Sequence, residues 1–462
     1  MITVVGMDGA PLGAQAQAAL TAATLVVGAR RHLATVPVLT APGRARTMVL
    51  GELAPALDAL AAHQGDAVVL ASGDPGFFGI VRALGERGLD CTVLPAVSCV
   101  ALAFARAGLP WDDAAVVSAH GRDPRPALNV CRAYPKVAVL TGPGCGPAEI
   151  GTALDGWERR LLVAERLGSD AERVTECSPA EAARRTWADP NVVLVLAGSP
   201  GSAPAAGKVM VAATITKDAD DCHNHHERNG PRLRWAAGGP AAAQDGWALA
   251  EERFDSRDAV ITKAEVRALA LARLAPGPGI LVWDVGAGSG SVAVECGRFG
   301  AAVIAVERDT LRCERVRANA ARHGVDVRVV AGEAPGALSG LPDPDAVFVG
   351  GGGPGVIEAV AARHPARIVT ALAAVERTGP AHAALSAAGY AVHGALVQAA
   401  RFAPLSGGVH RLAATNPVFL LWATAGQAPG PGTTERAAGP GTTEPVSLGS
   451  AGRGPGLPGA AR

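Results

Sequence analysis

The sequence has few aromatic residues, no excess of either charge and no paired cysteine motif. Aromatic residues make up 4% of the 462 residues and hydrophobic residues 49%, so the core has to be built mainly from Ala, Val and Leu. Lys plus Arg and Asp plus Glu both number 42, which gives a formal net charge of zero. Nucleic-acid binders usually carry a clustered basic excess, because neutralising phosphates supplies much of their affinity. The composition therefore favours a small-molecule substrate over a nucleic acid.

The eight cysteines form no CxxC pair, and several lie in apolar runs, where a thiol behaves as a small hydrophobic group. This pattern is typical of a reducing compartment rather than of a disulfide framework. The N-terminal MITVVGMDGAPLG has neither the basic region nor the long apolar region of a signal peptide. The chain also lacks an apolar run of transmembrane length. We therefore expect a cytoplasmic protein without membrane contact.

Short apolar runs bounded by turns recur along the chain, with helical segments between them. Continuous apolar runs of this kind predict an α/β fold with mainly parallel sheets covered by helices on both faces. The predicted strands are 2–6, 24–28, 67–72, 91–95, 114–118, 136–141, 161–165 and 191–197, then 280–285, 302–307, 325–330, 345–350, 367–372 and 416–423.

The chain is too long for one ordinary core and fits two domains plus connectors. We place the domains at 1–198 and 247–424. Residues 199–246 are polar and loop-like, which predicts an interdomain linker or local insertion. Residues 425–462 contain GPGTTE twice and are predicted to be disordered.

The predicted linker contains Cys222, His223, His225 and His226. Their spacing does not match a zinc site, which normally pairs separated couples of ligands. We therefore predict no functional metal site.

The strongest motif is DVGAGSG (284–290), which directly follows an apolar run. Glycines allow the backbone to turn sharply and to approach a ligand closely. Glu307 ends the next strand, where a carboxylate reaches ribose hydroxyls in Rossmann-like units. A dinucleotide site commonly reads GxGxxG, but here the loop is GxGxG after Asp284, and a carboxylate suits the ammonium of S-adenosylmethionine. The predicted cofactor residues of this loop are Asp284, Gly286, Ala287, Gly288, Ser289, Gly290 and Glu307.

Two further segments follow the next predicted strands. GEAP (332–335) suits an adenine contact by the Glu333 side chain and the Ala334 backbone, and it equally suits a helix N-terminus with Glu in its first turn. DAVFVGGGG (345–353) has glycines where nucleic-acid amino-methylases have an aromatic residue to stack a flipped base. This difference favours a bulky small molecule.

The segments VITKAEVRALALARL, VWDVGAGSGSVAVE, AVERD, GEAP and PDAVFVGGGG together resemble the decarboxylating precorrin methyltransferase family across 247–424. The resemblance implies a Rossmann-like class I methyltransferase domain that uses S-adenosylmethionine. It also implies a cofactor contact by Thr262, in the TK pair.

In the first half, GDPGFFG (73–79) and PAVSC (95–99) each follow a predicted strand and together resemble the tetrapyrrole methylase family. That family binds its cofactor in a cleft between two α/β subdomains. The resemblance implies cofactor contacts by Gly9, Gly73, Asp74, Phe77, Ser98, Cys99 and Thr141. The family's first loop usually reads GxGPG, whereas this chain has GMDGA (6–10), which puts the contact at that loop in doubt.

The combined resemblance implies methylation of a precorrin at C5 and C15, with loss of CO2 from the C12 acetate, in cobalamin biosynthesis. It also implies one S-adenosylmethionine per domain and a homo-oligomer. No catalytic residue can be named. His364, Arg401 and His410 are polar candidates for assisting decarboxylation, but a solvated surface position explains each more simply. The alternatives are a methyltransferase acting on nucleic acid or protein, and a half that binds cofactor or tetrapyrrole without catalysis.

Overall fold

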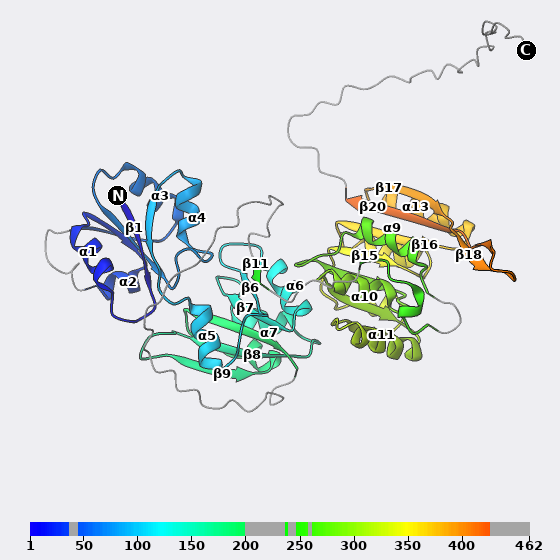
Figure 1. The fold of residues 1–462 in the computed structure, drawn as a ribbon, viewed down its shortest axis with the longest axis horizontal. Helices are drawn as coiled ribbons and strands as arrows, with labels where there is room; N and C mark the ends of the chain where they lie inside the picture. The colour runs from blue at the N-terminus through cyan, green and yellow to red at the C-terminus, as the bar shows by residue number, and fades with distance from the viewer. Residues whose placement is uncertain (37–44, 199–235, 239–245, 257–260, 426–462) are drawn as a thin grey trace, which may run out of the picture. The chain divides into compact units, whose positions relative to one another are not determined.

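The computed structural model describes residues 1–36, 45–198, 236–238, 246–256 and 261–425 (Figure 1). The Cys222–His226 cluster and the predicted C-terminal tail lie outside these residues, apart from Ala425. Within the described part of the chain, no helix has the length and apolar character needed to cross a membrane.

The first sheet is entirely parallel and has the order β3-β2-β4-β1-β5. Its strands are β1 (Ile2–Met7), β2 (Leu25–Gly28), β3 (Arg46–Val49), β4 (Ala67–Ser72) and β5 (Cys91–Leu94). Apolar residues of α1 (Ala14–Ala22) and α2 (Arg30–Ala34) pack on one face, and those of α3 (Leu53–Ala62) and α4 (Ile80–Glu86) on the other. The carboxyl ends of β1, β2 and β4 therefore meet at one edge, where α/β folds bind ligands.

The second sheet is mixed, with the order β11-β6-β7-β10-β8-β9. Its strands are β6 (Ala115–Ser118), β7 (Lys136–Leu140), β8 (Arg159–Glu165), β9 (Arg173–Cys177), β10 (Asn191–Ala197) and β11 (Ala236–Gly238). Only β6 and β7 pair in parallel, so the prediction of mainly parallel sheets was wrong here. β8 and β10 are buried almost throughout. A continuous apolar run indicates that a strand is buried, but it does not indicate whether the neighbouring strands are parallel or antiparallel. The short β11 lies inside the segment predicted as a linker.

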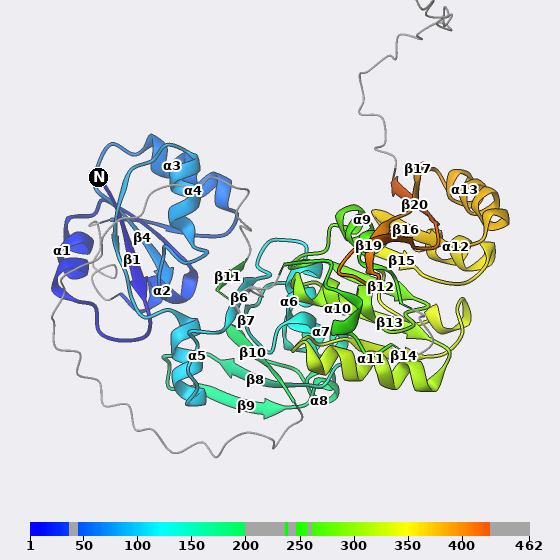
Figure 2. The same cartoon turned by 45° about the vertical axis from the view of Figure 1, so that its right-hand side comes forward.

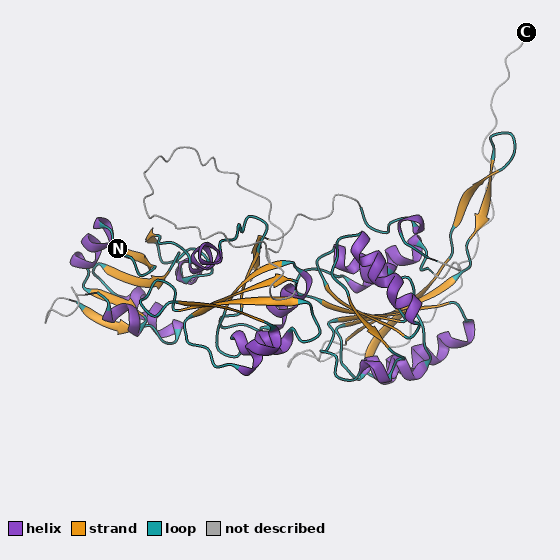
Figure 3. Cartoon of the chain, turned by 90° about the horizontal axis from the view of Figure 1, so that it is seen from below, coloured by secondary structure: helices purple, strands orange, loops and turns teal. Residues whose placement is uncertain are grey.

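Helices cover both faces of this second sheet as well. The apolar side of α5 (Cys99–Ala107) packs on one face. Three helices pack on the other: α6 (Arg125–Ala133), α7 (Pro147–Ala153) and α8 (Pro179–Arg184). Figure 3 shows the sheets in orange between layers of purple helices.

The third sheet has the order β14-β13-β12-β15-β16-β20-β17. The first five of these strands run in parallel: β14 (Arg328–Ala331), β13 (Ala302–Glu307), β12 (Leu281–Val285), β15 (Ala346–Val349) and β16 (Arg367–Leu372). β20 (Val418–Ala425) is antiparallel to both β16 and β17 (Tyr390–Val397). The chain leaves β12 toward β13 and later returns to its other side as β15. The topological switch point, where such sheets bind ligands, therefore lies between β12 and β15.

Two sets of helices enclose this sheet (Figure 2). Residues of α9 (Ala264–Leu274), α10 (Ser291–Arg298) and α11 (Thr310–Arg322) pack on one face, and those of α12 (Pro354–Ala361) and α13 (Thr378–Ala387) on the other. Short 3-10 helices lie at Glu251–Arg253, Gly336–Leu338 and Val375–Arg377. Outside the sheet, β18 (Ala400–Pro404) and β19 (His410–Ala414) form a separate antiparallel hairpin.

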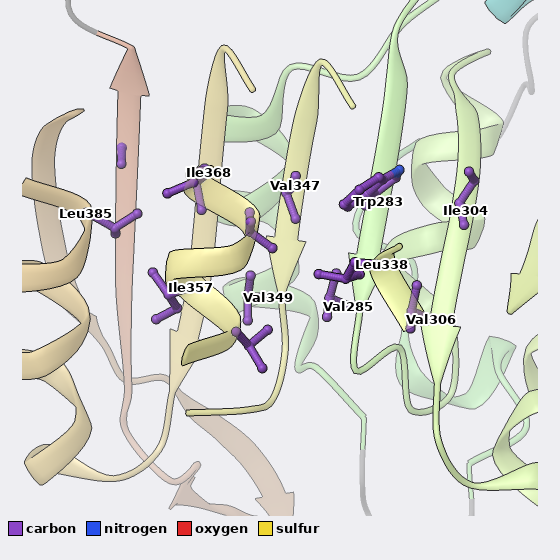
Figure 4. Packing of buried hydrophobic residues seen from close by; sticks show 14 of the residues in the cluster. Trp283, Val285, Ile304, Val306, Leu338, Val347, Val349, Ile357, Ile368 and Leu385 are labelled. Carbon is purple, nitrogen blue, oxygen red and sulfur yellow. The ribbon is translucent and has the colours of Figure 1, made fainter. Parts of the chain in front are cut away.

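Alternating strand residues build the core of this domain. Trp283 and Val285 of β12 point to the face covered by α12 and α13, and they belong to the same apolar cluster as Ile357 and Leu385 of those helices (Figure 4). Val282, which directly precedes Trp283, points to the opposite face and belongs to the other cluster. Each fully buried large apolar side chain contributes about 1.5–3 kcal/mol, so this layer holds the glycine-containing loop after β12 on a rigid base.

The predicted α/β fold class, with two N-terminal subdomains and a Rossmann-like C-terminal sheet, is confirmed. Every predicted strand is present, with shifts of a few residues at its ends. The strands that the prediction missed are β3, β9, β11, β17, β18 and β19. Of these, β3, β9, β11 and β17 are sheet edges, and β18 and β19 form the hairpin.

Candidate active sites

The glycine-containing loop after β12 has a backbone that only glycine adopts readily. Gly286, Gly288 and Gly290 have φ values of +75°, +59° and +75°. A Cβ built on Gly290 would lie 2.8 Å from Val316 of α11, so this glycine also permits close packing of the loop on the helix. The loop exposes backbone groups at the carboxyl edge of the sheet, as a cofactor-binding loop requires. Ala287 and Ser289 lie within the same turn.

Glu307 faces this loop from the end of β13. Its carboxylate accepts the Gly288 N–H at 2.9 Å and the Asp309 N–H at 3.1 Å. The side chain is buried beside the glycines, at the position predicted for a ribose-binding carboxylate. Its contact with a ribose stays a prediction. The structure thus brings together the loop and the acid that the sequence placed 21 positions apart.

Asp284 is almost fully buried, and its carboxylate accepts the N–H of Ala293 in the first turn of α10 at 2.9 Å. Burial raises the pKa of Asp284 to about 7, and the nearby charge of Glu307 adds to this effect. The bond to Ala293 gives Asp284 a structural part in holding α10 against the loop. Direct contact with a cofactor ammonium stays a prediction.

Thr262 lies in the described chain before α9 (residues 246–256 and 261–263), which we call the arm and which a buried ion pair fixes to the domain. Arg267 of α9 and Glu295 of α10 are both inaccessible to solvent, with 2.7 Å between Nε and Oε1. The Arg267 guanidinium also donates to the carbonyl oxygens of Thr262 and Leu249. Glu295 accepts the N–H groups of Ala248 and Leu249, each at 2.8 Å. This network orders the chain before α9 at Ala248, Leu249 and Thr262, and sequence reasoning missed it.

Asn319 of α11 was also missed. Its buried side-chain amide donates to the carbonyl of Ser289 at 2.8 Å and to that of Asp255 at 3.1 Å. The Asp255 N–H donates in return to the Asn319 side-chain oxygen at 2.8 Å. One side chain therefore ties the glycine loop to the arm that leads toward Thr262.

The Glu333–Ala334 segment follows β14 at the same edge of the sheet. The Gly332 N–H donates to the backbone oxygen of Glu307 at 2.9 Å, which places the segment beside the ribose-binding candidate. Glu333 itself is largely exposed and pairs with Arg308 at 3.1 Å. Its carbonyl accepts the N–H of Ala337 in the 3-10 helix, so the segment does begin a helical turn. An adenine contact by Glu333 and Ala334 stays a prediction.

The N-terminal half contains an open cleft of about 1170 Å³. Strand ends of the first sheet line one wall, and loops of the second sheet line the other. Among the residues predicted to bind cofactor, Gly9, Gly73, Cys99 and Thr141 line this cleft. Burial raises the pKa of the Cys99 thiol, which keeps it protonated and argues against a nucleophilic role. Thr141 donates to the carbonyl of Asn191 at 2.7 Å, joining the ends of β7 and β10.

The other three predicted residues do not line the cleft and have local structural contacts. Asp74 accepts the Gly76 N–H at 2.8 Å, which closes the turn after β4. Ser98 caps α5 by accepting the Ala101 N–H at 3.1 Å. Phe77 packs with Phe78 against the apolar cluster that contains Phe104 of α5. Their contacts with a cofactor stay predictions.

The family model for tetrapyrrole (corrin/porphyrin) methylases matches residues 5–183, and that for the precorrin methyltransferase domain matches 252–425. A precorrin-6Y C(5,15)-methyltransferase (decarboxylating) of a Sinorhizobium species is 36% identical over 375 residues, which cover 78% of this chain and 80% of the relative. The chain belongs to the precorrin-6Y C(5,15)-methyltransferase family.

Shorter relatives carry one of the two activities in their names. The cobalt-precorrin-7 C(5)-methyltransferase of Salmonella typhimurium is 34% identical over 183 residues, covering 38% of this chain and 89% of the relative. A probable cobalt-precorrin-6B C(15)-methyltransferase (decarboxylating) of Pyrobaculum calidifontis is 40% identical over 132 residues, covering 27% of this chain and 68% of the relative.

The structure gives a physical reason for the unusual GMDGA loop in this precorrin-6Y C(5,15)-methyltransferase family member. Gly9 has a φ of +91°, and a Cβ built on it would lie 1.9 Å from the carbonyl oxygen of Gly168 on the opposite wall. The Asp8 carboxylate accepts the N–H groups of Ala10 at 3.0 Å and Val97 at 3.2 Å, so it links the loops after β1 and β5. The loop is therefore held by contacts of its own, and Gly9 is required by packing.

The three candidates for assisting decarboxylation lie away from the carboxyl edge of the third sheet or are already engaged. His364 precedes β16 and lies near the opposite edge. Arg401 makes hydrogen bonds of 2.6–2.9 Å to the carboxylates of Glu251 and Glu265, so its guanidinium is committed to two ion pairs. His410 is exposed on β19, with its ring 6.0 Å from that of Phe402. None of the three positions supports a direct role in the reaction.

Proposed function

We propose that the chain methylates a precorrin at C5 and C15 and removes CO2 from the C12 acetate, with S-adenosylmethionine as methyl donor. One observation carries this proposal. The N-terminal half of the chain matches the tetrapyrrole methylase family, and the C-terminal half matches the precorrin methyltransferase domain. Each half also has its own glycine-containing site at a sheet edge. The relatives named for C(5) and C(15) activity support assigning C5 to residues 1–198 and C15 with decarboxylation to residues 247–424. A small-molecule biosynthetic role also accords with the expected cytoplasmic location.

We propose one S-adenosylmethionine per domain. When bound, S-adenosylmethionine supplies an electrophilic methyl group on a sulfonium, whose neutral thioether leaving group needs no general acid. In the C-terminal domain, the residues fit this cofactor because the buried Glu307 carboxylate faces a backbone turn made by three glycines with positive φ. Glu307 would hold the ribose, and the 286–290 loop would hold the amino-acid end.

In the N-terminal domain, Gly9, Gly73 and Cys99 would hold the second cofactor at the carboxyl edge of the first sheet. The chain's contribution to both transfers is to position the reacting groups and to exclude water. A nucleic-acid substrate is disfavoured by the zero net charge. The cleft of about 1170 Å³ exceeds the roughly 300–1,000 Å³ of common ligand pockets, which suits a cofactor together with a macrocycle.

The test supplies the full-length chain with precorrin-6Y and S-adenosylmethionine carrying a 13C-labelled methyl group. Mass spectrometry should find two labelled methyl groups and one lost carboxyl group in the product, and NMR should place the labels at C5 and C15. A product that keeps the acetate carboxyl, or carries labels at other ring positions, would refute the proposal.

We also propose that the chain assembles with copies of itself through the β18–β19 hairpin. Phe402 is 80% exposed on this hairpin, and Leu405, Val409 and Leu412 are exposed with it. A two-stranded hairpin is marginally stable alone, and contiguous exposed apolar side chains mark interaction surfaces. Light scattering on the full chain should give an oligomer that Phe402→Ser with Leu412→Ser dissociates. A monomeric wild-type protein would contradict this proposal.

A further inference from the structure

The N-terminal cleft contains a three-residue hydrogen-bonded chain whose function the cofactor assignment leaves open. Arg31 and His32 follow β2, and Ser72 ends β4, so the pairing of these strands brings the three together. All three line the cleft. Arg31 Nη2 lies 2.8 Å from Ser72 Oγ, which in turn lies 3.2 Å from His32 Nε2.

The protonation state of His32 allows its Nε2 to accept a hydrogen bond from Ser72 in the tautomer that carries the proton on Nδ1. Burial, followed by the charge of Arg31, lowers the pKa of His32 to about 4, so the ring is neutral at physiological pH. A guanidinium can only donate, so the Ser72 oxygen accepts from Arg31. The Ser72 hydroxyl can then donate to Nε2 of the neutral ring. The buried His32 thereby orients Ser72, and Ser72 orients Arg31.

Arg31 keeps most of its hydrogen-bonding capacity for a ligand. A guanidinium has five N–H donors in a planar fork that matches a carboxylate. No ion pair of Arg31 is found among the described residues. The acidic side chains that line the cleft each accept a local hydrogen bond: Asp8 from Ala10 and Val97, Glu149 from Gly146, and Asp189 from Asn191.

Arg31 borders the predicted cofactor contacts on the side away from Gly9 and Cys99, because its partner Ser72 directly precedes Gly73. Gly73, Gly9 and Cys99 follow β4, β1 and β5, whereas Arg31 follows β2, on the other side of β4 in the order β3-β2-β4-β1-β5. A second ligand beside the cofactor would therefore meet Arg31. Precorrins carry acidic side chains such as the C12 acetate, and they are the substrate class of the proposed function.

We propose that Arg31 binds a side-chain carboxylate of the tetrapyrrole in the N-terminal cleft, and that Ser72 and His32 are positioning residues for it. The assignment rests on the proposed function and deepens it. Arg31 would therefore affect substrate binding, because it sets the orientation of the macrocycle for methyl transfer to C5. The cofactor is assigned to Gly9, Gly73 and Cys99. The matched control is Arg30, which is exposed on the same helix and does not line the cleft.

The experiment measures C5 methylation kinetics of the full-length chain with precorrin-6Y, and S-adenosylmethionine affinity by calorimetry. Hydrogen bonds to charged groups contribute about 1.5–3 kcal/mol, so Arg31→Gln should raise the KM for the tetrapyrrole roughly 10- to 100-fold. The Kd for S-adenosylmethionine should stay within about twofold of wild type, which also shows that the variant folds. Arg30→Gln should change neither quantity.

Ser72→Ala should raise the same KM several-fold with kcat little changed, and Ser72→Thr, which keeps a hydroxyl, should restore it. A structural role for Ser72 would instead lower thermal stability and cofactor affinity together. An unchanged tetrapyrrole KM in Arg31→Gln overturns the assignment. A weakened cofactor Kd with an unchanged KM also overturns it, and assigns Arg31 to the carboxylate of S-adenosylmethionine. A wild-type chain that transfers no methyl group to C5 overturns the proposed function itself, and the assignment with it.

Discussion

Replacing Glu295 by Gln tests whether the buried ion pair holds the arm that carries Thr262. The substitution keeps the shape of the side chain but leaves the Arg267 guanidinium without its countercharge at a position of zero solvent exposure. Removing one partner of a buried ion pair costs about 3–5 kcal/mol. Since whole domains are stable by only about 5–15 kcal/mol, Glu295→Gln should remove a large part of the stability of the C-terminal domain.

The assay is urea unfolding of the full-length chain, followed by hydrogen–deuterium exchange of peptides from α9 and α10. Exchange localises the loss to the C-terminal domain, and peptides covering 248–249 and 262 should lose protection with it. Glu314→Gln, an exposed substitution on α11, is the matched control and should cost less than about 0.5 kcal/mol. Replacing both Arg267 and Glu295 by Met should recover part of the loss, because the Arg267 charge is then absent, although Arg298 also loses its contact with Glu295 at 3.7 Å. A cost below about 1 kcal/mol for Glu295→Gln would refute this reasoning.

Three further predictions concern the cofactor sites. Gly288→Val should weaken S-adenosylmethionine binding at the C-terminal site roughly 5- to 30-fold, because a left-handed conformation costs about 1–2 kcal/mol for an L-residue; calorimetry that finds the wild-type affinity at this site in the variant would contradict it. The free energy of unfolding of Asp284→Asn, relative to that of the wild type, should increase by up to about 4 kcal/mol as the pH rises from 4 to 8. A carboxyl whose folded pKa is raised to about 7 binds its proton more tightly in the folded state, so the wild type loses stability as pH rises through this window. Urea unfolding of both proteins across this range checks the sign, and a difference independent of pH would contradict it. Gly9→Ala should reduce C5 methylation by more than tenfold with C15 methylation unchanged, because the added Cβ overlaps the Gly168 oxygen at 1.9 Å; product NMR showing normal C5 labelling would count against the loop packing.

The sequence predicted every strand that is largely buried, and each strand that it missed is a sheet edge or part of the β18–β19 hairpin. β4, β8, β10 and β12 are buried along most of their length, and their apolar runs are unmistakable. β3 and β9 are mainly exposed at sheet edges, and no apolar run marks them. Strand direction in the second sheet was mispredicted because burial on both faces looks the same for parallel and antiparallel neighbours.

At the sites, motifs with backbone requirements were predictable, and contacts between distant side chains were not. The 286–290 glycines and Glu307 meet as predicted, because both follow neighbouring parallel strands. The Arg267–Glu295 pair and Asn319 join elements through single buried side chains, and nothing in the local sequence distinguishes them from exposed helix residues. Similarly, the pairing of Gly9 with Gly168 depends on two loops 159 positions apart.

The central claim is that the chain contains two independent methyl-transfer sites, and product analysis of single-site variants tests it most directly. Full-length Gly9→Ala and Gly288→Val are each incubated with precorrin-6Y and a limiting concentration of labelled S-adenosylmethionine, and the early products are weighed by mass spectrometry. Gly9→Ala should yield mainly a product with one labelled methyl group and one lost CO2, whereas Gly288→Val should yield mainly a product that keeps its acetate carboxyl. If Gly9→Ala still adds both methyl groups at the wild-type rate, the N-terminal domain is not an independent catalyst and the account of two sites is wrong.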